Sequence, residues 1–197
     1  MKSAVKAQLA RRKPAPDGRL IARCRKGDEQ AWADLIDKYK NLIYSIPIKL
    51  GMYDDAADIF QAVCVDLLAG LPKLRKPQAL PKWLMQVCYH KCLEHGARAR
   101  KQVPLEDDDA QKIPADDGAT LPEDLVLQLQ REQMVRDVVA ALPERCERMV
   151  RMLFYETPPR PYQAIAEELS LATGSIGFIR GRCLVRLRKQ LEKMGFQ

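Results

Sequence analysis

The stretch that decides the fold runs from Tyr162 to Arg188 and reads YQAIAEELSLATGSIGFIRGRCLVRLR. Its apolar residues recur at helical spacing, which predicts a short helix followed by a longer one, with Leu171 in the turn between them. The small residue Ala166 allows two such helices to cross closely. This layout indicates a helix-turn-helix. The apolar positions are Ile165, Ala166, Leu169, Ile176, Ile179, Cys183, Leu187 and Leu191.

The longer helix of this pair is expected to have an outward face beside its apolar stripe. The residues on that face are Ser175, Phe178, Arg182, Arg186 and Lys189. Arginines on an exposed helix can bind phosphates and base edges in a DNA major groove. The stretch therefore predicts a DNA-binding element.

The charge of the chain supports a polyanionic partner. The 197 residues carry a net charge of +7, which favours nucleic acid over acidic proteins or neutral metabolites. The sign of the charge also changes along the chain, with cations in residues 2–26 and 180–193 and acids between them. The acidic runs are Glu106–Asp109, Asp116–Asp117 and Glu123–Asp124. Two basic modules joined by an acidic tether are the expected organisation.

The cysteines and the N-terminus bear on the compartment. All six cysteines lie within apolar helical stripes, so we expect reduced side chains that fill the core of a cytoplasmic protein. No segment approaches ~18 consecutive apolar residues, so no membrane insertion is expected. Residues 1–16 lack the apolar segment of a secretory signal, and we expect a disordered basic tail there.

Hydrophobic spacing predicts an all-α protein of two small helical modules joined by a flexible acidic linker. The first module covers residues 17–101 and holds four helices, the linker covers 102–119, and the second module covers 120–197. Asp28 is expected to cap the second helix, and a basic loop over 73–81 precedes the fourth. The third helix is expected to turn Ile59, Phe60, Val63, Cys64, Leu67 and Leu68 inward. In the second module Phe154 is expected to face inward as well.

Several short strings resemble the extracytoplasmic-function (ECF) group of bacterial RNA polymerase sigma factors, in the sigma-70 family. Each string is weak alone, but their order and spacing together are specific. They are Gly27–Trp32, Asp58–Gln61, Trp83–Leu84, Leu142–Arg145, Tyr162–Glu167 and the pattern of Ser175, Ile176, Gly177, Arg180, Arg182 and Arg186–Arg188.

The resemblance implies a factor that binds core RNA polymerase, recognises promoter −10 and −35 elements and promotes DNA opening. Residues 17–101 would bind core polymerase and the −10 element, and residues 120–197 would bind the −35 element. The polymerase-binding residues would be Asp54, Asp55, Asp58 and Gln61 on the third helix. Ala62 departs from the family pattern, in which an acid usually follows the glutamine.

The resemblance also assigns promoter contacts. Residues that would bind the −10 element are Arg75, Lys76, Gln78, Lys82 and Lys91, in and after the basic loop, whereas Trp83 is expected to pack in the core. Residues that would bind the −35 element are Thr173, Ser175, Phe178, Arg180, Arg182 and Arg186. Thr173 could cap the last helix, since Ala172 stands where the family usually has a hydroxyl. Gly177 and Gly181 suggest close approach of another backbone.

Two further roles come from the resemblance. The linker would run toward the active-site and RNA-exit path of the polymerase, with a plain spacer as the alternative. An inhibitory anti-sigma protein is a further expected partner, although no residue of the sequence points to it.

Some of these residues would also fit other function classes. Cys88, His90, Cys92 and His95 could suggest a metal site, but on a continuous helix His90 points away from the other three. No metal, cofactor or enzyme activity is therefore expected. A stand-alone helix-turn-helix transcriptional regulator remains the alternative function, although it leaves the first module without a role.

Overall fold

The computed structural model describes residues 15–102 and 120–196, and the side chains of 15–98 and 120–196. Every regular element within these ranges is a helix, and no strand occurs among them, which confirms the all-α prediction. The expected tail over 1–16 lies almost wholly outside the described residues, and the acidic linker lies outside them beyond Gln102.

The chain divides into two compact units whose boundary falls inside a helix. The N-terminal unit covers 15–130 of the described residues and the C-terminal unit covers 131–196. Residues 120–130, which the sequence analysis assigned to the second module, pack with the N-terminal unit, since Leu121 and Leu129 belong to its buried core.

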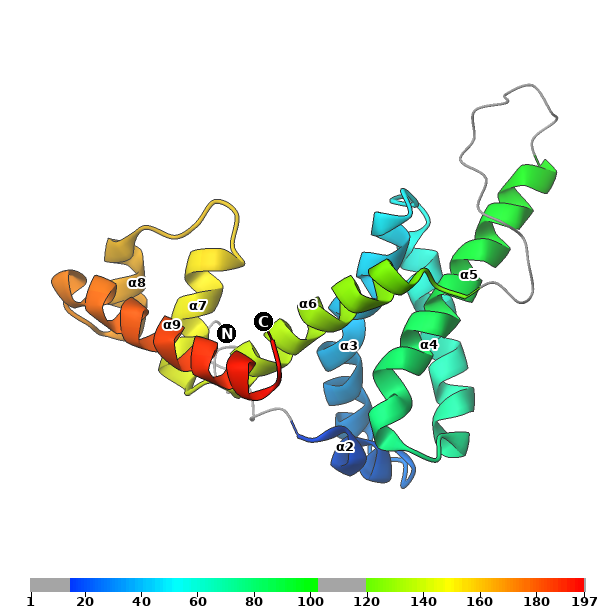
Figure 1. Cartoon of the computed structure of the whole chain (residues 1–197), viewed down its shortest axis with the longest axis horizontal. Helices are drawn as coiled ribbons and strands as arrows, with labels where there is room; N and C mark the ends of the chain where they lie inside the picture. Colours follow the sequence, from blue (N-terminus) through cyan, green and yellow to red (C-terminus); the bar gives the residue numbers. More distant parts are fainter. Residues whose placement is uncertain (1–14, 103–119, 197) are drawn as a thin grey trace, which may run out of the picture. The chain divides into compact units, whose positions relative to one another are not determined.

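The N-terminal unit is a helical bundle (Figure 1). Its helices are α2 (Asp17–Cys24), α3 (Glu29–Lys49), α4 (Ala56–Gly70), α5 (Leu80–Gln102) and the first part of α6 (Glu123–Ala141). Two short 3₁₀ turns, η1 (Leu71–Lys73) and η2 (Pro77–Ala79), connect α4 to α5. The basic loop expected over 73–81 is therefore shorter than predicted, because α5 already begins at Leu80.

Local chemistry explains where the first helices begin and end. Gly27 has a φ of +79° after α2, a conformation that glycine adopts without steric cost. The Asp28 carboxylate accepts a hydrogen bond from the Ala31 amide at 3.0 Å, which confirms the predicted cap. The Arg23 guanidinium, 2.8 Å from the same carboxylate, and the Ala31 amide hold the pKa of Asp28 below its usual value. At the start of α2, the Asp17 carboxylate accepts hydrogen bonds from Lys38 and Tyr39 of α3.

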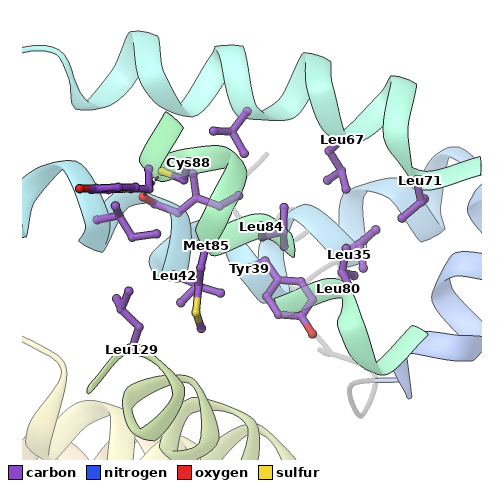
Figure 2. Close-up of a cluster of buried hydrophobic side chains, with 14 of the residues drawn as sticks. Leu35, Tyr39, Leu42, Leu67, Leu71, Leu80, Leu84, Met85, Cys88 and Leu129 are labelled. Carbon is purple, nitrogen blue, oxygen red and sulfur yellow. Dashed lines mark hydrogen bonds between the residues drawn. The ribbon is translucent and has the colours of Figure 1, made fainter. Parts of the chain in front are cut away.

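The core of the bundle forms where the inward stripes of the helices meet (Figure 2). Leu42 of α3 and Leu84 of α5 are completely buried there, and so is Leu129 of α6. The predicted inward residues of α4 are only partly confirmed. Ile59, Val63 and Leu67 are buried, but Leu68 is 56% exposed because it is rotated by about 100° or more from these three residues around the helix.

The C-terminal unit contains the predicted helix-turn-helix. Its elements are the end of α6, α7 (Glu144–Phe154), α8 (Tyr162–Leu169), the 3₁₀ turn η3 (Thr173–Ser175) and α9 (Ile176–Lys193). One buried cluster joins α7, α8 and the start of α9 through Met149, Ile165 and Ile176. The expectation that Phe154 faces inward is wrong: it is 58% exposed at the end of α7, where the chain turns away from this cluster.

The cysteine prediction needs one correction in this unit. Cys146 of α7 and Cys183 of α9 form a disulfide rather than two thiols. Both belong to a second buried cluster with Val139, Leu142 and Val150, so the bond lies within apolar packing. Cys24, Cys64, Cys88 and Cys92 are free, as expected.

The disulfide is expected to stabilise the C-terminal unit by restricting its unfolded state. A cross-link over a sequence separation of 37 residues corresponds to a loop-closure contribution of about 4 kcal/mol in the chain-entropy model. We expect dithiothreitol to lower the unfolding temperature of this unit. Under denaturing, non-reducing conditions four of the six cysteines should alkylate.

The matched control is the double variant Cys146→Ala/Cys183→Ala, whose unfolding temperature should not respond to dithiothreitol. Alkylation of all six cysteines before reduction, with no effect of reductant on the wild-type transition, would contradict the expectation.

Candidate nucleic-acid interface

The turn between α8 and α9 is built by a left-handed residue and an apolar plug. Ser170 has a φ of +53°, which ends α8. The Leu171 amide then donates a hydrogen bond to the Ala166 carbonyl at 2.8 Å, and the Leu171 side chain packs on the α7–α8 core. Ala166 is 2% exposed, in agreement with the close helix crossing expected at this position. Arg148 of α7 forms an ion pair with Glu168 of α8, which joins the first helix of the helix-turn-helix to α7.

The outward face of α9 carries the aromatic and cationic residues that the sequence placed there. Phe178 is 69% exposed, and Arg182 and Arg186 are exposed as well. The Arg182 guanidinium lies 5.7 Å from the centre of the Phe178 ring. A guanidinium stacked on an aromatic ring keeps its donors at the ring edge free for other acceptors. We call Phe178, Arg182 and Arg186 the α9 outer face.

Arg180 does not lie on the α9 outer face. At 3.6 residues per turn, it is rotated about 160° from Arg182. Its guanidinium donates a hydrogen bond to the Tyr162 hydroxyl at 2.6 Å and lies 5.9 Å from the centre of that ring. Arg180 therefore links α9 to the start of α8, and a contact with the same DNA edge as Arg182 would require it to leave Tyr162.

The two hydroxyl residues before α9 have different surroundings. Thr173 is exposed, whereas Ser175 is half-buried and its hydroxyl donates to the Ala172 carbonyl at 2.7 Å. No side-chain hydrogen bond caps η3 or α9, so the proposed cap by Thr173 is not formed.

The glycines of α9 lie in open space. A Cβ atom added at Gly177 or Gly181 would meet no described atom of the chain within 4 Å. Packing within the protein therefore gives no reason for glycine at these helical positions. Since a helical glycine costs about 1 kcal/mol relative to alanine, these positions favour an approach by another molecule.

In the N-terminal unit, the connection from α4 to α5 presents a second set of polar side chains. Arg75, Lys76, Gln78 and Lys82 are all exposed, while Leu71 and Leu80 at the two ends of the connection are buried. Trp83 is half-buried and packs on the core, as predicted. Its ring fills the space beside Gly70, where an added Cβ would lie 2.6 Å from the ring.

Lys91 is not part of this exposed set. Its ammonium lies 3.2 Å from Asp66 of α4 and 3.3 Å from Glu94 of α5. Burial alone would lower the pKa of Lys91, but the hydrogen bonds to Asp66 and Glu94 outweigh that effect and raise it. Lys91 therefore joins α4 to α5 as a paired cation.

The start of α4 exposes the acidic residues that the sequence singled out, and an apolar strip continues their face. Asp54, Asp58 and Gln61 are exposed, whereas Asp55 precedes the helix and lies 3.9 Å from His95. Val65 is 63% exposed and Leu68 is 56% exposed on the following turns. The sequence pattern predicted Leu68 to face inward and did not single out Val65. We call Asp58, Gln61, Val65 and Leu68 the α4 outer face.

The Cys88–His95 segment lies on α5 with its members in different environments. Cys88 and Cys92 are completely buried, and the Cys88 thiol lies 3.4 Å from the Ile43 carbonyl. The neighbouring Cys92 side chain and burial raise the pKa of the Cys88 thiol far above its usual value. His90 lies 2.7 Å from Gln86, and His95 faces Asp55. Within the described ranges, no three histidine, cysteine or acidic side chains gather as a metal-binding group.

Among the helices in the described part of the chain, none is long and apolar enough to cross a membrane. The α9 outer face and the turn before it instead define a helical protein with a helix-turn-helix, the class in which the second helix enters the DNA major groove.

Comparison with known proteins shows which group the chain resembles. The chain is 25% identical over 185 residues to the ECF RNA polymerase sigma factor SigW of Bacillus subtilis (strain 168), covering 88% of this chain and 96% of that protein. It is 24% identical over 184 residues to the ECF RNA polymerase sigma-E factor of Haemophilus influenzae, covering 89% and 93% of the two chains. The sigma-E factor of Escherichia coli (strain K12) is 24% identical over 165 residues, 80% of this chain and 84% of that protein.

These alignments confirm the resemblance to the ECF group of the sigma-70 family, which the sequence analysis drew from short strings. No family model matches the chain. The similarity extends over both units, so it concerns the whole arrangement rather than the helix-turn-helix alone.

Proposed function

We propose that this protein is an ECF sigma factor, which binds core RNA polymerase, directs it to promoters and promotes DNA opening. The observation that carries the proposal is the similarity to proteins named ECF sigma factors over 80–89% of the chain. The alternative, a stand-alone regulator, would explain the C-terminal unit but would leave the N-terminal unit without a function. The factor itself would catalyse no reaction, since nucleotide addition belongs to the polymerase.

Two exposed sets of side chains support this proposal. The α9 outer face would read the −35 element, with Arg182 and Arg186 on phosphates and base edges. The exposed Arg75, Lys76, Gln78 and Lys82 would hold the single strand at the −10 element, where cations follow the backbone. Thr173 and Ser175 would contribute at the edge of the −35 surface, and Arg180 would do so after release from Tyr162.

The α4 outer face is our candidate for docking on core polymerase. Asp54 and Asp58 supply negative charge at the start of the helix, and the exposed Val65 and Leu68 extend the same surface with apolar area. Exposed apolar side chains next to charged ones are typical of the centre and rim of a protein interface. The apolar strip offers a contact that does not require an acid at Ala62.

We further propose a cytoplasmic location, because the polymerase acts there, and control by an inhibitory anti-sigma protein, as in the group it resembles. Reducing conditions would open the Cys146–Cys183 bond. The two thiols would then pack in the same cluster as small apolar side chains.

Run-off transcription tests the proposal directly. With purified core polymerase and a promoter library, we expect start sites that require this protein. Arg182→Ala/Arg186→Ala should reduce those transcripts at least about tenfold, because each lost base or phosphate contact weakens binding by about 1–3 kcal/mol.

The matched control is Arg131→Ala/Arg188→Ala, which removes the same number of exposed cations at positions that do not lie on the α9 outer face. Retained DNA binding without any polymerase-dependent initiation would refute the sigma proposal and favour the stand-alone regulator.

Docking on polymerase has its own prediction. Leu68→Asp should weaken the affinity for core polymerase about tenfold, equivalent to about 1.4 kcal/mol, because it places an acid in the apolar strip. Leu127→Asp, at a residue on α6 that is 47% exposed, serves as the control. Equal affinities of the two variants, measured by fluorescence anisotropy, would exclude the α4 outer face as the docking surface.

The glycines of α9 predict two effects of opposite sign. Gly177→Ala/Gly181→Ala should stabilise the C-terminal unit by about 1–2 kcal/mol, since alanine favours a helix. The same change should weaken binding to promoter duplex, because the methyl groups would fill space that DNA occupies. Urea unfolding and a filter-binding titration measure the two effects. A variant that is more stable and binds promoter DNA as well as the wild type would show that DNA does not approach these residues.

A further inference from the structure

The connection between α4 and α5 is attached to α2 by one cationic side chain. Arg25 follows the last residue of α2, and its guanidinium donates hydrogen bonds to the carbonyls of Leu71, at 3.3 Å, and Leu74. These two carbonyls belong to η1 and to the residue after it. One planar guanidinium therefore binds two points of the connection at once.

The position of the Leu74 carbonyl connects this contact to the exposed residues Arg75 and Lys76. That carbonyl is part of the peptide unit that joins Leu74 to Arg75. Holding it fixes the backbone from which Arg75 and then Lys76 extend into solvent. The Leu74 side chain packs partly buried on the core below, so this peptide unit is held from two sides.

A second contact between the same elements holds the other end of the connection. η2 packs on α2, and the Pro77 ring lies next to Gly18, where an added Cβ would be 3.7 Å from the ring. Leu71 and Leu80 are buried at the two ends. The exposed residues Arg75, Lys76 and Gln78 thus lie on a short segment whose backbone is fixed at Leu74 and at Pro77.

We propose that Arg25 is a positioning residue for strand capture at the −10 element: it fixes the 71–79 segment in the conformation that presents Arg75, Lys76 and Gln78 to the single strand. This inference rests on the proposed function. The physical reason is preorganisation, because a segment that is already ordered loses less conformational entropy when it binds DNA. Arg25 itself contacts no DNA in this role.

The free protein provides the first test, and this test does not depend on any activity. Arg25→Ala should accelerate tryptic cleavage after Arg75 about tenfold, as expected for the loss of hydrogen bonds to a charged donor. Lys26→Ala is the matched control, since it removes one exposed cation from the neighbouring position and should leave the cleavage rate within about twofold. Equal cleavage rates in Arg25→Ala and wild type would overturn the proposal at its structural step.

The second test uses the full chain with core polymerase on a duplex promoter. Arg25→Ala should reduce permanganate reactivity at the −10 element about tenfold. Its affinities for core polymerase and for a duplex carrying only the −35 element should stay unchanged, which separates this role from general loss of structure. Arg25→Lys should give an intermediate reactivity, because an ammonium retains the charge without the planar fork.

The outcomes distinguish this inference from the function on which it rests. Absence of opening by the wild type would refute the proposed function, and with it the strand-capture role. Normal opening by wild type and Arg25→Ala alike would refute the inference alone. An equal loss in Lys26→Ala would assign the effect to charge rather than to the two carbonyl contacts, and would also refute it.

Discussion

Burial of the inner stripe of α9 determines which of its side chains are exposed and can contact another molecule. Ile176 and Cys183 are almost completely removed from solvent by packing against α7 and α8. Because residues of a helix keep a fixed angular spacing, this burial turns Phe178 and Arg182 outward, and Arg186 is exposed one turn further along the helix. The same constraint operates in α4, where burial of Ile59, Val63 and Leu67 turns Asp58, Val65 and Leu68 to the surface. Both candidate interfaces follow from apolar packing on the opposite sides of their helices.

The sequence allowed the all-α fold, most helix limits and the α9 outer face to be predicted, because each depends on local spacing. It failed where an apolar residue did not face the core. Leu68 and Phe154 were expected inside, but the first lies on the wrong side of its helix and the second lies past the last packed turn. Apolar character alone does not specify whether a side chain faces the core. A run such as residues 62–69 contains more than one set of apolar residues that could form the inward face of a helix.

Pairwise contacts between distant segments were also beyond the sequence. The hydrogen bond from Arg180 to Tyr162 and the ion pairs of Lys91 give two of the predicted DNA-contact residues partners within the protein. The contact of Arg25 with Leu71 and Leu74 spans more than forty residues. Such contacts depend on how the helices cross in space. The spacing of apolar residues in the sequence predicts a helix but does not specify how two helices cross. The pairing of Cys146 with Cys183 was missed for the same reason.

That pairing also changes the covalent topology of the C-terminal unit. The bond closes a covalent ring that contains most of α7, the proline-rich turn, all of α8 and the first half of α9. A protease that cuts one peptide bond inside the ring, for example in the 170–175 turn between α8 and α9, opens the chain without separating it into two molecules. The two halves of the helix-turn-helix would remain joined and could refold on each other until the sulfurs were reduced. In its oxidised form, the unit can therefore survive a break in the very segment that connects its helices.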